Sequence, residues 1–174
     1  MIKNLQYFAV LVVLSVLFFS CGKGSKESAG NVTSTIPDAS EFAKSKLGES
    51  VKLVYKGDMT GNKREDALAL VINKEFGDNR YWIQKGSIIE KSLTGWNTLL
   101  EMGEVLKTPK GQMIEQQPAT NGYIVSFKTD EKPMNLYISI SNADGRPSSD
   151  EAIIKWNQKD SIYEFKTGYD DSTP

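Results

Sequence analysis

Alternation of apolar and polar residues in the last third of the chain constrains the fold more than any other feature. Between residues 123 and 165 it recurs in four short runs, and turn-forming segments at 130–133 and 157–160 separate two pairs of them. Successive side chains of a strand point to opposite faces of its sheet. The pattern therefore predicts an antiparallel meander with one face on a core and the other in water.

The same period of two begins earlier, at Val51, and continues with Leu53 and Tyr55. A continuous apolar run at 67–72 is typical of a central strand, and two shorter strands are expected at 81–83 and 88–89, around Gly86. Segment 96–100 fits either a helix or a strand. The predicted strands number about seven to nine.

One helix is expected ahead of these strands. Asp38 can cap its first turn, Glu41 completes a capping box three residues later, and Gly48 ends it. The fold predicted from sequence is α+β and mostly β: a single domain with one N-terminal helix followed by an antiparallel meander.

Composition removes several classes of function. The chain of 174 residues carries 21 Lys and Arg against 22 Asp and Glu, so no basic face for nucleic acid is expected. It has no histidine and one cysteine, Cys21. A folded domain without these residues has no histidine-dependent triad, cysteine nucleophile, structural zinc site or disulfide. With no nucleophile motif either, we expect a protein that is not an enzyme.

The first residues have the pattern of an export signal. Lys3 gives a positive start, the stretch from Leu5 to Phe19 is apolar, and Cys21 follows at once. A helix that spans a bilayer needs about 20 apolar residues, whereas this shorter stretch suits the apolar part of a signal peptide. The alternative is a plain N-terminal membrane helix with an incidental cysteine.

Ser20-Cys21-Gly22 resembles the lipobox of bacterial lipoproteins. The resemblance implies a signal peptide at 1–20, cleavage before Cys21, and fatty acyl groups attached there. Gly22, with no Asp after the cysteine, resembles proteins sent to the outer membrane, facing the periplasm or the surface. Residues 21–36 would be the lipidated cysteine and a small polar tether, 37–168 the globular domain, and 169–174 a polar tail.

The segment between the first two predicted strands suits a calcium loop. Oxygen-bearing side chains occupy loop positions 1, 3, 5 and 9, which are Asp58, Thr60, Asn62 and Asp66. The backbone carbonyl of Arg64 stands at position 7. A tight loop around an ion directs alternate residues inward, and calcium takes six to eight oxygens. The alternative is a metal-free turn in which these side chains bond to the loop backbone.

The segment resembles the calcium loop of FG-GAP and VCBS-type repeats, which implies that Asp58, Thr60, Asn62 and Asp66 are calcium ligands. Asn62 stands where the family has Asp, and Lys63 where it has Gly. With two carboxylates, the dissociation constant should be about 10⁻⁴ to 10⁻³ M. A second loop, at 142–150, repeats part of the spacing, but a simple strand connection is the expectation there.

These features predict a membrane-anchored, non-enzymatic module that binds an unknown protein or glycan partner. The alternative is a carboxylate-based hydrolase of cell-envelope polymers, for which Glu101 and Glu104 are an example of a carboxylate pair. Four aromatic residues are expected mainly in the core, although they could also form a binding platform: Trp82, Trp96, Tyr123 and Trp156.

Overall fold

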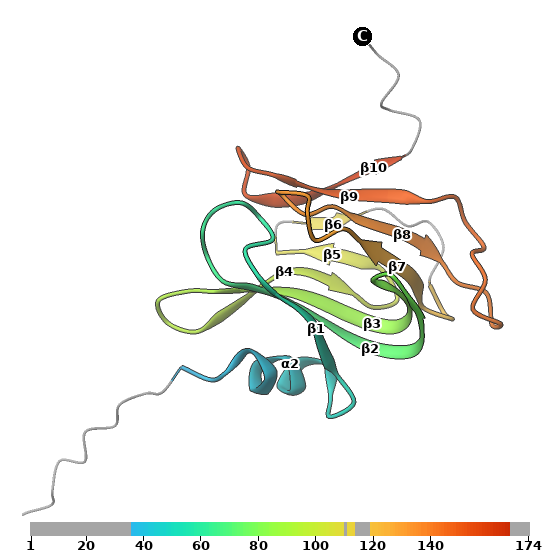
Figure 1. Cartoon of the computed structure of the whole chain (residues 1–174), viewed down its shortest axis with the longest axis horizontal. Helices are drawn as coiled ribbons and strands as arrows, with labels where there is room; N and C mark the ends of the chain where they lie inside the picture. Colours follow the sequence, from blue (N-terminus) through green and yellow to red (C-terminus); the bar gives the residue numbers. More distant parts are fainter. Residues whose placement is uncertain (1–35, 110, 114–118, 168–174) are drawn as a thin grey trace, which may run out of the picture. The chain divides into compact units, whose positions relative to one another are not determined.

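The computed structural model describes residues 36–109, 111–113 and 119–167. Helix α2 (Ala39–Leu47) precedes ten strands that form one sheet (Figure 1). The strands are β1 (Lys52–Gly57), β2 (Asp66–Gly77), β3 (Arg80–Lys91), β4 (Trp96–Met102), β5 (Leu106–Thr108), β6 (Gly111–Met113), β7 (Tyr123–Phe127), β8 (Leu136–Ile140), β9 (Ala152–Asn157) and β10 (Ile162–Thr167).

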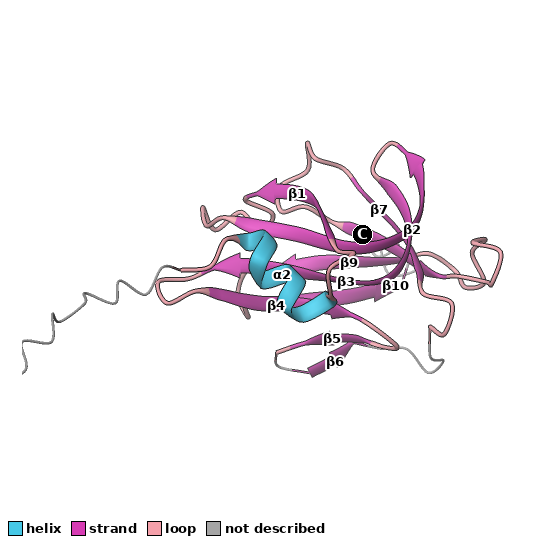
Figure 2. Ribbon diagram, turned by 90° about the horizontal axis from the view of Figure 1, so that it is seen from below, coloured by secondary structure: helices cyan, strands magenta, loops and turns pink. Residues whose placement is uncertain are grey.

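The helix begins and ends where the sequence predicts. The Asp38 carboxylate accepts a hydrogen bond from the Ala39 amide at 2.8 Å, and Gly48 ends the helix with φ +94°. Ala39 and Ala43 are buried against the sheet. Their small side chains let the helix lie close to one sheet face, as Figure 2 shows.

Strand β3 is the centre of the sheet. One of its edges pairs with β2, and its other edge is shared by β4 along residues 86–91 and by β7 along residues 80–83. Two arms therefore leave the same edge of β3: β4–β5–β6, and the meander β7–β8–β9–β10. All the pairings are antiparallel.

The main core lies on the sheet face opposite α2. It joins apolar side chains from both arms, among them Leu68 and Ile88 from the centre, Leu100 from the first arm, and Ile138 and Ile154 from the second. These side chains are essentially buried. The meander folds because each of its strands contributes alternate residues to this one core.

The prediction of a mostly β single domain with one N-terminal helix is confirmed. Two details differ from the expectation. The short strands at 81–83 and 88–89 are parts of the single strand β3, with Gly86 inside it. A Cβ on Gly86 would lie 2.6 Å from Leu70 and 2.8 Å from Met102, so this glycine permits close packing and does not break the strand. Segment 96–100, which was ambiguous, belongs to strand β4.

Candidate functional site

The predicted calcium loop connects β1 to β2 and is closed around the carboxylate of Asp58. One oxygen of Asp58 accepts the Gly61 amide at 2.7 Å, and the other accepts the Lys63 amide at 3.0 Å. Gly61 and Lys63 both have positive φ, +77° and +69°. Lys63 thus adopts a left-handed conformation, which glycine adopts most readily.

Asp66 ties the same loop to the core. Its Oδ2 atom accepts hydrogen bonds from the Met59 amide (2.8 Å), the Thr60 amide (3.1 Å) and the Thr60 hydroxyl (3.2 Å). All three residues are fully buried, and the Met59 side chain is part of the main core. The Met134 amide donates to the Met59 carbonyl at 2.7 Å, which joins the loop to the connection before β8.

The other two predicted residues contact Glu90, which the sequence analysis did not single out. Asn62 donates to one oxygen of Glu90 through its side-chain amide, and Arg64 donates to the other through its guanidinium at 2.8 Å. Glu90 is only 4% exposed and lies directly opposite Asp66 in the pairing of β2 with β3. The sole hint in the sequence is an acidic residue directly after the apolar pair Ile88-Ile89.

The loop fits calcium poorly. Backbone amides, which are hydrogen-bond donors, face both oxygens of Asp58 and one oxygen of Asp66, and the Arg64 amide donates to the Asn62 side-chain oxygen at 2.8 Å. Among the described residues, no three acidic, histidine or cysteine side chains are grouped so as to hold a metal ion. These contacts favour the metal-free interpretation of the loop, and calcium binding stays a hypothesis for experiment.

Melting curves decide between the two interpretations. Because the loop donors already satisfy Asp58, we expect the same melting temperature in a chelator and in a few millimolar calcium. At a calcium concentration near its dissociation constant, a weak site would add only about 0.4 kcal/mol to the free energy of unfolding. The calcium concentrations must therefore extend well above a millimolar. A rise in melting temperature that Asp58→Ala removes would establish a calcium site.

Burial governs the electrostatics beneath the loop. The pKa of Asp66 is raised from its ordinary value of 3.8 to about 6, chiefly by burial and in smaller part by the nearby Glu90, against the opposing effect of the Met59 and Thr60 hydrogen bonds. The Asp66 Oδ1 atom is buried and has no hydrogen-bond partner among the described residues. Burial also raises the pKa of Tyr163 well above its ordinary value, with the charges of Asp66 and Glu90 adding to the effect. Asp66 and its hydrogen bonds therefore form a buried structural contact that holds the loop, and not an open pocket.

The second acidic loop forms a turn. The Arg146 amide donates to the Asp144 carboxylate at 3.1 Å, and the Arg146 guanidinium lies 3.3 Å from it. Gly145 packs on Trp82, where a Cβ would lie 2.6 Å from the indole ring. Both observations describe an ordinary strand connection.

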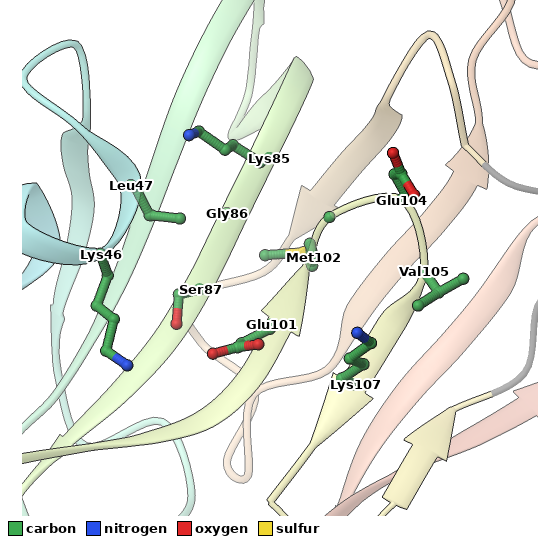
Figure 3. Close-up of a pocket in the computed structure, with 11 residues that line it drawn as sticks. Lys46, Leu47, Lys85, Gly86, Ser87, Glu101, Met102, Glu104, Val105 and Lys107 are labelled. Atoms are coloured by element: carbon green, nitrogen blue, oxygen red, sulfur yellow. The ribbon is translucent and has the colours of Figure 1, made fainter.

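An open pocket with several charged side chains lies beside the C-terminal end of α2. A hollow of about 340 Å³ is formed by the helix end, β3, β4 and the β4–β5 turn (Figure 3). Ser87, Glu101 and Lys107 lie in one row across β3, β4 and β5 and form part of its wall. A second hollow of about 700 Å³ shares Lys46, Glu101 and Lys107 with the first. Together they make a groove along the flank of α2, called here the α2 groove.

The α2 groove carries charges of both signs. Lys85, Lys107, Glu101 and Glu104 line it, and none of the four forms an ion pair with another described residue. Lys46 lies at its rim, with its ammonium 5.9 Å from the centre of the Phe42 ring. In Figure 3, the carboxylates of Glu101 and Glu104 lie on different sides of Met102 and do not face each other.

The aromatic residues contribute mainly to the core, as predicted. Trp96, Tyr123 and Trp156 are buried, and Trp82 is half-buried, with its indole N–H donating to the Asn121 carbonyl at 2.9 Å. They do not form an exposed platform.

The lipobox cysteine Cys21, the tether before residue 36 and the tail at 169–174 lie outside the described residues. Within the part of the chain that the structure describes, no helix combines the length and apolar content needed to cross a bilayer. Comparison with protein-family models, with curated proteins and with solved structures gives no match.

Proposed function

We propose that this chain is an exported, lipid-anchored protein that binds a small ligand in the α2 groove and does not transform it. The lipobox resemblance at Cys21 supports the anchor. The observation that carries the binding role is the groove itself, which is built on the sheet and lined by five charged side chains. None of the five forms an ion pair with another residue that the structure describes.

Charge complementarity indicates the class of ligand. Three ammonium groups and two carboxylates surround one hollow, and the two signs alternate around it: Lys46, Lys85 and Lys107 with Glu101 and Glu104. A ligand with a single charge would meet repulsion from one of these sets, whereas a zwitterion can pair with both. A small peptide or amino-sugar compound with an ammonium and a carboxylate group is therefore the best match.

The alternative, a carboxylate-based hydrolase, has one observation in its favour, because Glu101 and Glu104 line the same hollow. Hydrolysis of glycosides needs two carboxyl groups on either side of the scissile bond. The orientation of the two side chains in Figure 3 does not match that arrangement, which favours binding over hydrolysis.

Calorimetric titration of the detergent-solubilised full chain tests the proposal. We expect the zwitterionic dipeptide alanyl-alanine to bind at least about tenfold more tightly than its acetylated amide, which is about 1.4 kcal/mol. Glu101→Gln and Lys107→Gln should each weaken the zwitterion and leave the neutral compound unchanged. Lys52→Gln, at an exposed β1 position outside the groove, is the matched control.

Equal binding of the two dipeptides, or zwitterion binding that neither groove variant alters, would contradict the proposal. Release of free alanine from the dipeptide, lost in Glu101→Gln, would favour the hydrolase instead.

A further inference from the structure

The tip of the β3–β4 hairpin presents a leucine to solvent. Leu93 is 98% exposed, whereas the other large exposed apolar residues among those described, Ile36 and Phe76, are 37% and 43% exposed. The hairpin turn is tight, since the Ser92 amide and hydroxyl both contact the Gly95 carbonyl, at 2.7 and 2.9 Å. The turn thus holds Leu93 in a fixed, outward position.

This tip lies at the end of the domain where the chain enters from the tether. Trp96 begins β4 directly after the turn, and its indole N–H donates to the Pro37 carbonyl at 2.8 Å. Figure 1 shows the β3–β4 hairpin and the start of the described chain on the same side of the domain. Ile36 is the neighbour of Pro37, so both exposed aliphatic side chains belong to this end.

Phe76 marks the opposite end. It lies near the β2–β3 turn, and β3 has twelve residues, or about 40 Å of strand, between that turn and the one carrying Leu93. Two cations cover the Phe76 ring, since Lys74 and Arg80 lie 5.2 and 5.8 Å from its centre. Phe76 therefore has a local role that Leu93 lacks.

The proposed anchor joins the domain at the end that carries Leu93. Fifteen peptide steps separate Cys21 from Ile36, which limits their distance to about 50 Å. Insertion of one leucine is weak alone, but the anchor makes it an intramolecular event. Beside Leu93, Arg64, Lys91 and Glu65 line an open hollow of about 680 Å³. Arg64 pairs with Glu90 at 2.8 Å and Lys91 lies 3.8 Å from Glu65, so both cations belong to ion pairs within the domain and Leu93 is the group that this end offers to the lipid.

We infer that the β3–β4 hairpin is the membrane-contacting end of the domain and that Leu93 inserts at the bilayer surface. This inference rests on the lipid anchor proposed above. In this orientation β3 runs away from the bilayer, and the β2–β3 hairpin with Phe76 lies farthest from the lipid.

A fluorescent probe beside the leucine tests this orientation. Acylated Cys21 has no free thiol, so Thr94→Cys gives a single labelling position next to Leu93, and Glu75→Cys gives the matched position next to Phe76. The lipidated full chain is labelled with an environment-sensitive dye and reconstituted in vesicles of phosphatidylethanolamine and phosphatidylglycerol. We expect blue-shifted emission and quenching by headgroup-proximal spin-labelled lipid at position 94, and aqueous emission at position 75.

A second pair of samples isolates the leucine. Adding Leu93→Ser to Thr94→Cys should return the emission at position 94 to its aqueous value, with the melting temperature unchanged because Leu93 has no packing to lose. Aqueous emission at position 94 in a chain that has incorporated a fatty-acid analogue would overturn the inference and leave the anchor standing. Absence of fatty-acid label, or label that persists in Cys21→Ser, would overturn the anchor and the inference with it.

Discussion

Asp66→Ala is expected to destabilise the domain by about 3 kcal/mol and to lower the melting temperature by about 10 °C. The substitution removes the acceptor shared by the Met59 amide, the Thr60 amide and the Thr60 hydroxyl. Each buried donor left without a partner costs about 1–3 kcal/mol. Relief of a buried carboxylate offsets part of this loss, so the net cost is smaller than the sum.

Asp66→Asn is the matched control, because its side-chain oxygen still accepts from both amides. Denaturant unfolding at neutral pH should place it well above Asp66→Ala in stability. If the two variants were equally stable, the hydrogen bonds to Met59 and Thr60 would not be what holds the loop.

The pH dependence of stability is a second measurement that distinguishes the wild type from Asp66→Asn. The folded pKa of Asp66, about 6, lies above its ordinary value of 3.8 because the carboxyl is buried. The native state therefore holds this proton more tightly than the unfolded chain does. The resulting stability is fully present below about pH 4 and is lost as the pH rises through about 6. Relative to Asp66→Asn, the wild type should gain on the order of 2–3 kcal/mol between pH 7 and pH 4.

The architecture was predictable where local patterns determine it. Strands β7 to β10 follow from alternation because alternate residues of each enter the main core, and α2 follows from the Asp38 cap and Gly48. The expectation that their other face lies in water is wrong for β7 and β8, where Ile124 and Ser139 are buried as well. Strand β3 was predicted in two pieces because a glycine between apolar runs usually signals a break. Only the packing of Gly86 against Leu70 and Met102 shows why the strand continues.

The candidate sites were predictable only in part, since pairing between distant strands places their residues. The composition of the 58–66 loop predicted Asp58 and Asp66 as calcium ligands, which stays a prediction; in the structure both carboxylates accept hydrogen bonds from loop amides. Glu90, which accepts hydrogen bonds from Asn62 and Arg64, comes from β3, more than twenty residues later, through a strand register that no local pattern encodes. The α2 groove combines α2, β3, β4 and β5, and of its charged residues only Glu101 and Glu104 were singled out beforehand.

Gly122→Ala should prevent folding of the domain or destabilise it by more than about 4 kcal/mol. Gly122 precedes β7 at the point where this strand joins the edge of β3, and its φ is +80°. A Cβ here would lie 1.9 Å from the Ile83 carbonyl oxygen, a backbone atom that a side-chain rotation cannot move aside. The Gly122 carbonyl also accepts the Ser141 amide at 2.9 Å, so a shift of this residue would disturb the β7–β8 pair as well.

Gly103→Ala is the control for this substitution, because no atom lies within 4 Å of its added Cβ. Soluble yield, circular dichroism and thermal melting of the two variants measure the contrast, with Gly103→Ala expected within about 1 kcal/mol of wild type. A Gly122→Ala protein that melts with the wild type would mean that β7 does not join β3 at this glycine. The arm β7–β10 would then have another attachment to the sheet. The strong asymmetry expected between two glycines in connections follows from the branching of the sheet at β3, where the chain enters β7 so close to the β3 backbone at Ile83 that no space is left for a methyl group.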